Sequence, residues 1–175
     1  MAVNILSGSA DLYRAAVTLG DTTLSDPTPA AGVQSLKDGE FLFPLDASAG
    51  TTGWRRLAGN DEDAQPADGI PVMVFDQPGD MARQATGKVC VIKEASWTME
   101  TDMYQQDSLT PASYAIATEL TVRHVNPATT ADPNFSRSVL APAAAGEQIV
   151  GTVEAAPATM GSLMVVRINL SGEAV

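Results

Sequence analysis

The sequence has little of the chemistry that enzymes and metalloproteins use. Its 175 residues include one cysteine, Cys90, and one histidine, His124. A lone cysteine excludes a disulfide within the chain and is typical of a reducing compartment. A zinc site needs more Cys or His ligands than these two. Nucleotide-binding glycine motifs and the nucleophile elbow of hydrolases are absent too. The sequence therefore predicts no enzyme, no cofactor and no metal.

Positive charge is also scarce. Ten Lys and Arg residues stand against 21 Asp and Glu residues, a formal net charge of −11. Nucleic-acid binding needs Lys and Arg to displace phosphate counterions, so this balance argues against such a partner. No apolar run is long enough to span a bilayer, and the first residues lack the basic and apolar regions of a signal peptide. We expect no membrane partner and assembly in a cytoplasm.

Aromatic residues are few, with two Trp, three Tyr and four Phe, yet hydrophobic residues make up 45% of the chain. Any core must therefore be mainly aliphatic. Residues 114–125 alternate between a side with Leu120 and Val122 and a side with Glu119 and Arg123, the pattern of a half-buried strand. Shorter strands are expected at residues 40–46, 53–57, 70–75, 87–95 and 138–140.

Residues 148–170 give the clearest structural signal. Two β-rich stretches flank a Pro- and Gly-containing connection at residues 157–161, which predicts a hairpin. In the second stretch, Arg167 and Asn169 share a face that is more polar than the other. The apolar face holds Met164, Val166, Ile168 and Leu170. Together these patterns predict an all-β fold, with an antiparallel β-barrel or sandwich over residues 37–175.

Residues 1–36 differ from this pattern and are interpreted as an extended N-terminal arm. Apolar residues at helical spacing within residues 11–19 predict one or two helical turns, which need a partner surface to be stable. The Pro-rich stretch at residues 25–32 then favours an extended connector. We expect the arm to pack on a neighbouring subunit or partner.

Two further groups of residues are candidate sites, one for calcium and one for a protein interface. The acids at residues 61–68 begin like a calcium loop, but Pro66 stands where such a loop needs Gly, so a solvated acidic loop is favoured. Trp54, Arg55 and Arg56 combine residue types that are enriched at interface hot spots. The alternative is a Trp that covers the core beside two solvated arginines. Candidate interface residues are therefore Leu12, Tyr13, Trp54, Arg55 and Arg56.

Several strand and turn patterns carry a family resemblance. They are Lys-Asp-Gly-Glu-Phe-Leu-Phe-Pro-Leu-Asp-Ala-Ser at 37–48, Met-Glu-Thr-Asp-Met-Tyr at 99–104, and the stretches at 114–122, 145–154 and 161–168. Over about its last two-thirds, the chain resembles capsid decoration, or cement, proteins of tailed bacteriophages. The resemblance implies a compact β-barrel or β-tulip, often a homotrimer, that binds the major capsid protein outside the head and stabilises the shell. The location would be the virion, assembled in the bacterial cytoplasm.

Two other functions stay open at this stage. A tail or baseplate β-module would also lack catalytic motifs, and a ring assembly would favour it over a trimer. A glycan-binding module is the third, although that class usually displays aromatic side chains over a groove.

Overall fold

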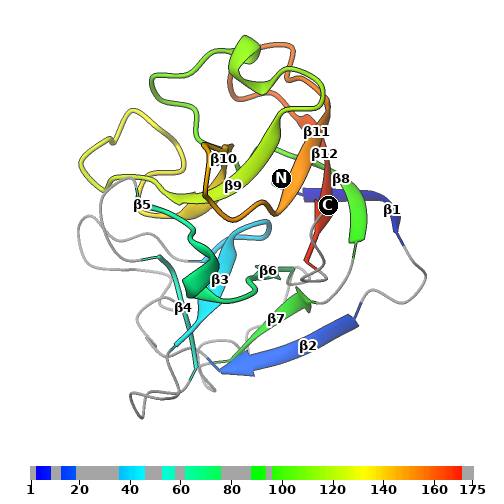
Figure 1. Cartoon of the computed structure of the whole chain (residues 1–175), viewed down its shortest axis with the longest axis vertical. Coiled ribbons are helices and arrows are strands. Elements are labelled where there is room, and N and C mark those ends of the chain that lie inside the picture. The colour runs from blue at the N-terminus through cyan, green and yellow to red at the C-terminus, as the bar shows by residue number, and fades with distance from the viewer. Residues whose placement is uncertain are drawn as a thin grey trace.

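The computed structural model describes residues 3–8, 13–18, 36–45, 53–57, 62–75, 88–93 and 96–170. Within them the protein is all-β, as predicted, with two antiparallel sheets and 3-10 turns in place of longer helices (Figure 1). In the described residues the strand orders show no closed barrel, and the two sheets are arranged like a sandwich. No helix in this described part of the chain is long and apolar enough to cross a bilayer.

The larger sheet has the strand order β1-β8-β12-β11-β9-β10, with β5 paired to β9. Its strands are β1 (Val3–Gly8), β5 (Glu62–Asp63), β8 (Ser96–Thr101), β9 (Glu119–His124), β10 (Ser138–Pro142), β11 (Gly151–Ala155) and β12 (Met164–Asn169). The predicted hairpin is confirmed, because β11 pairs with β12. The apolar face of β12 is also confirmed: Met164, Val166 and Ile168 are fully buried.

The smaller sheet has the order β2-β7-β6-β3-β4. Its strands are β2 (Tyr13–Thr18), β3 (Phe41–Pro44), β4 (Trp54–Arg55), β6 (Val72–Val74) and β7 (Lys88–Lys93). Alternate residues of these strands point to opposite faces of the sheet and pack in two hydrophobic clusters. Phe41 and Phe43 join the main core between the sheets, together with Trp97 of β8. Leu42 and Val72 belong to a second cluster on the other face.

The N-terminal residues differ from the predicted arm in two stretches. The helix expected within residues 11–19 is wrong, because β2 lies there and pairs with β7 from Tyr13↔Lys93 to Thr18↔Lys88. β1 pairs with β8 of the same chain, and its Val3 packs against the main core. Apolar residues that can pack on a helix can equally complete a sheet edge, and long-range pairing decided between them. Residues 19–35 lie outside the described part.

A pair of buried tyrosines closes one end of the core. The rings of Tyr104 and Tyr114 meet edge to face with centroids 5.0 Å apart. Tyr114, in the 3-10 turn η4 (Pro111–Tyr114), donates its hydroxyl to the Gln105 carbonyl at 2.7 Å. Tyr104 donates to the Ser162 carbonyl at 2.8 Å and accepts from the Gly161 N–H at 3.0 Å. The two hydroxyls thus fix the β8–β9 connection and join it to the β11–β12 connection.

We expect stability to fall as the pH rises above about 10, where tyrosines of the unfolded chain ionise. Burial is the main cause that raises the pKa of both Tyr104 and Tyr114 in the folded protein. The unfolded state then loses protons that the folded state retains, so unfolding is favoured with increasing pH. Urea titrations at several alkaline pH values, with tyrosinate absorbance as a second readout, measure this slope. Tyr114→Phe should flatten it; an unchanged slope would contradict the assignment.

Candidate functional site

The structure separates the five predicted interface residues. Leu12 lies outside the described residues, and Tyr13 begins the edge strand β2. Trp54 is half-buried and packs against the second apolar cluster, as the core-covering interpretation requires. Arg55 binds the Asp68 carboxylate at 3.4 Å. The interface role of these four residues stays a prediction.

Arg56 differs from the predicted surface position. It is only 7% exposed, and its guanidinium holds the fully buried Glu40 carboxylate through Nε and, at 3.1 Å, through Nη2. Nε of Arg137 lies 3.9 Å from the same carboxylate. Burial lowers the pKa of Arg137, while the charge of Glu40 opposes that shift. Glu40, Arg56 and Arg137 directly flank β3, β4 and β10, so this cluster of two arginines on one buried carboxylate links the ends of the three strands.

His124 and Ser138 form a cross-strand pair rather than an open catalytic dyad. The two residues stand opposite each other in β9 and β10, with Nδ1 and Oγ 3.4 Å apart. Ser138 is fully buried, and its Oγ accepts the Leu57 N–H at 3.1 Å. A substrate has no approach to that hydroxyl in this arrangement, so the pair links strands.

The acidic loop is more ordered than a solvated loop. Asp63 forms an ion pair with Arg123, whose Nη2 lies 2.7 Å from Oδ2 of the carboxylate. Asp68 accepts the Gln65 N–H at 2.9 Å and closes the 3-10 turn η3 (Pro66–Asp68). No group of three potential metal ligands occurs in the described ranges. These carboxylates therefore brace the loop against β4 and β9.

A buried carboxylate organises the long β9–β10 connection. Asp132 is 1% exposed and accepts the backbone N–H groups of Gln106, Asp107 and Asn134 at 2.7, 2.9 and 2.8 Å. Asn134 adds two bonds from its Nδ2, to the carbonyls of Asp102 and Tyr104. Sequence reasoning did not identify this hydrogen-bond cluster, because the partners Gln106 and Asp107 lie 26 and 25 residues from Asp132 along the chain.

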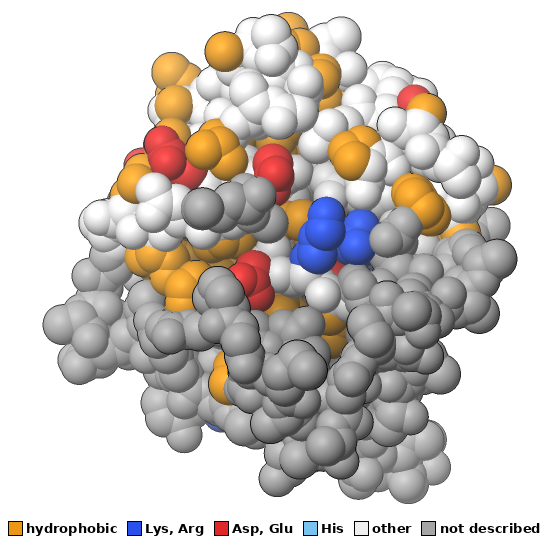
Figure 2. All heavy atoms as spheres, turned by 180° about the vertical axis from the view of Figure 1, so that it is seen from behind, with side chains coloured by type: hydrophobic (Ala, Val, Ile, Leu, Met, Phe, Trp, Pro, Cys, Tyr) orange, Lys and Arg blue, Asp and Glu red, His pale blue; other side chains and the backbone are white. Residues whose placement is uncertain are grey.

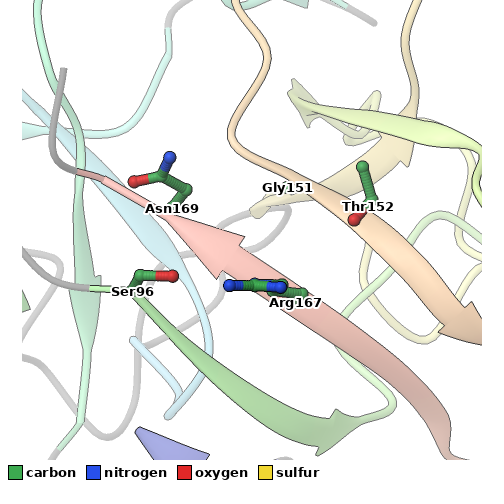
Figure 3. A pocket seen from close by; sticks show the side chains of 5 residues that line it. All are labelled: Ser96, Gly151, Thr152, Arg167 and Asn169. Carbon is green, nitrogen blue, oxygen red and sulfur yellow. The ribbon is translucent and has the colours of Figure 1, made fainter. Parts of the chain in front are cut away.

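A polar hollow on the larger sheet is the best candidate for a binding site. It measures about 290 Å³ and is lined by residues of three adjacent strands, namely Ser96 of β8, Gly151 and Thr152 of β11, and Arg167 and Asn169 of β12. In Figure 3 the guanidinium of Arg167 and the hydroxyl of Ser96 point toward each other across the hollow. Arg167 is exposed, so its charge is accessible to a ligand.

Strand register explains the composition of the hollow. Arg167 pairs with Thr98 of β8 on one side and with Thr152 of β11 on the other. The buried residues of β12 alternate with it, so this face points away from the core. At Gly151 an added Cβ would overlap the backbone oxygen of Arg167, so only glycine lets the two strands lie this close. The sequence placed Arg167 and Asn169 on one face but gave no sign of the hollow.

Comparison with known proteins adds no relative. No family model, no curated protein and no solved structure matches the chain. The site's chemistry must therefore be argued from its own residues.

On the face shown in Figure 2, the charged side chains form small, separate groups among uncharged and apolar atoms.

Proposed function

We propose that this chain is a structural virion protein: a decoration, or cement, protein that binds the outside of a phage head across junctions of the major capsid protein. In this proposal it acts as a homotrimer, reaches the virion from the bacterial cytoplasm and catalyses no reaction. The proposal is supported by the sequence resemblance and by one structural observation, the exposed edge strand β1.

β1 ends the strand order of the larger sheet, at the right-hand side of Figure 1. Among the described strands, β8 is its one partner. An edge strand presents unpaired backbone groups on its outer side, which a partner protein can contact. An attachment protein can use such a surface, and β1 lies in the N-terminal segment that is predicted to contact a partner.

Leu6 gives this edge a specific recognition residue. The register of β1 against β8 shifts between Ile5 and Ser7, so Leu6 occupies a β-bulge. Its side chain is 48% exposed, whereas Val3 and Ile5 pack toward the core. A bulge interrupts an edge and limits addition of a long strand. The exposed leucine, rather than a continuous ladder, would then carry the contact with the capsid.

We expect Leu6→Asp to weaken binding to undecorated heads of the phage whose genome encodes the chain by roughly tenfold or more, because loss of a hot-spot side chain costs about 2 kcal/mol and about 1.4 kcal/mol is tenfold. Binding is measured by co-sedimentation over a protein and salt series. Leu163→Asp is the matched control, since Leu163 is 47% exposed outside β1. It should bind as the wild type does.

Stoichiometry tests the rest of the proposal. Saturation at three copies per threefold or quasi-threefold position, with a trimer in analytical ultracentrifugation, is the expected result. Linked copies combine weak contacts into a persistent complex. No affinity for heads, or equal binding by both leucine variants, would overturn the proposal. Binding to isolated tails instead would establish the tail or baseplate alternative.

A further inference from the structure

Arg167 differs from the other described arginines because it has no acidic partner within the described residues. Among the arginines whose side chains the structure describes, each of the other four lies within an ion pair: Arg55 with Asp68, Arg56 and Arg137 with Glu40, and Arg123 with Asp63. Arg167 has no ion pair or hydrogen bond from its side chain within that described set. In a chain with 21 acids and 10 bases, an exposed guanidinium without an ion pair to any described acid is unusual.

Acids lie near the hollow on the neighbouring strands, namely Glu100 of β8, Glu119 of β9, which pairs with Thr152, and Glu154 of β11. Among the described residues, none of them forms an ion pair with Arg167. Glu100 lies two residues along β8 from Thr98, the register partner of Arg167. Its Oε2 accepts a hydrogen bond from Nδ2 of Asn4 in β1 at 3.2 Å. Asn4 thus contacts Glu100, and no described acid is paired with the guanidinium beside the hollow.

We propose that the hollow binds a small, hydroxylated carboxylate, the uronic acid unit of an acidic saccharide. The planar guanidinium matches a carboxylate and can hold it through two parallel hydrogen bonds. Hydroxyls of Ser96 and Thr152 lie around it and can exchange hydrogen bonds with ring hydroxyls of the ligand. This site is independent of the edge strand proposed to contact the capsid.

The size and composition of the hollow favour this ligand over others. About 290 Å³ accommodates a single sugar ring and lies at the lower end of ligand pockets. None of the described residues that line it is aromatic, so the recognition proposed here comes from charge and hydroxyl contacts rather than from ring stacking. A neutral sugar would leave the guanidinium unpaired, and a simple carboxylate such as acetate would leave the hydroxyls unused.

The experiment titrates the full-length protein with glucuronate, glucose and acetate, using backbone amide NMR shifts and calorimetry. Glucuronate should bind and shift amides of β8, β11 and β12, whereas glucose and acetate should bind roughly tenfold or more weakly. Arg167→Met should weaken glucuronate binding by a similar factor, and Arg167→Lys by less, since it keeps the charge. Thr152→Val should weaken glucuronate binding and leave the weak acetate binding unchanged.

Lys37→Met is the control, because it removes one positive charge from an exposed residue outside the hollow. It should bind glucuronate as the wild type does. Equal affinity for glucuronate and acetate, equal losses in Arg167→Met and Lys37→Met, or no shifts with glucuronate would each overturn the proposal. Head binding by Arg167→Met is measured in parallel, so failure at this site is distinguishable from failure of the decoration function.

Discussion

Replacing Glu40 with alanine is expected to lower the free energy of unfolding by about 3–5 kcal/mol, the usual cost of breaking a buried ion pair from one side. The Glu40 side chain is 0% exposed, and those of Arg56 and Arg137 are 6% and 3% exposed. Without the carboxylate, two guanidinium groups stay buried with no acid between them. Urea denaturation followed by tryptophan fluorescence measures the loss as a shift in midpoint.

Two further variants separate this cluster from a general sensitivity to mutation. Glu154→Ala removes an exposed carboxylate from β11 and should change stability by less than about 0.5 kcal/mol. Replacing Glu40, Arg56 and Arg137 together with methionine or leucine should cost less than Glu40→Ala alone, because no charge is then left unpaired. Similar losses for Glu40→Ala and Glu154→Ala would contradict the role of the cluster.

Asp132→Ala is expected to cost about 3 kcal/mol, because backbone N–H groups that bond to a buried charge lose their acceptor. The carboxylate uses both oxygens: Oδ2 accepts from Gln106 and Asp107, and Oδ1 accepts from Asn134. Asp132→Asn keeps one acceptor oxygen and should therefore lose about half as much. Thermal and urea unfolding, with hydrogen exchange at the three amides, provide the measurement.

Asp107→Ala is the control beside this hydrogen-bond cluster. Its backbone N–H still bonds to Asp132, and its own side chain only accepts from the neighbouring Ser108 hydroxyl in an exposed contact. The expected change is within about 0.5 kcal/mol. If Asp107→Ala destabilised the protein as much as Asp132→Ala, the backbone bonds to Asp132 would not explain the loss.

The all-β class and most strand positions were predictable, because alternation of polar and apolar residues reports which face of a strand is buried. In β9 the expected face is correct, with Leu120 and Val122 fully buried. Its predicted start is wrong: Pro111–Tyr114 form the turn η4, and Ala117 has a φ of 68°. The alternating pattern extends the strand back to residue 114. The turn that begins at Pro111 and the left-handed backbone at Ala117 prevent a strand there, so β9 begins only at Glu119.

The site residues were harder to predict than the strands. Arg56 reads as a surface residue because its partner Glu40 is 16 positions away and is brought to it by strand pairing. The hollow around Arg167 depends on three strands whose order β8-β12-β11 is not sequential. The local sequence indicates on which face of a strand a side chain lies. Which side chains of other strands lie beside it depends on the order of the strands in the sheet. Of the five residues that line the hollow, the sequence predicts a shared face only for Arg167 and Asn169.

The position of β12 has a consequence for how the chain folds during synthesis. β12 lies between β8 and β11, so the larger sheet cannot form until residue 169 has left the ribosome. β1 is made first but pairs with Thr101 and its neighbours, nearly a hundred residues later. Contacts so distant in sequence slow folding. Strands that have been made but not yet paired with their partner strands are prone to aggregation. Nascent chains of this protein should therefore depend on ribosome-associated chaperones more than a chain of sequential hairpins would.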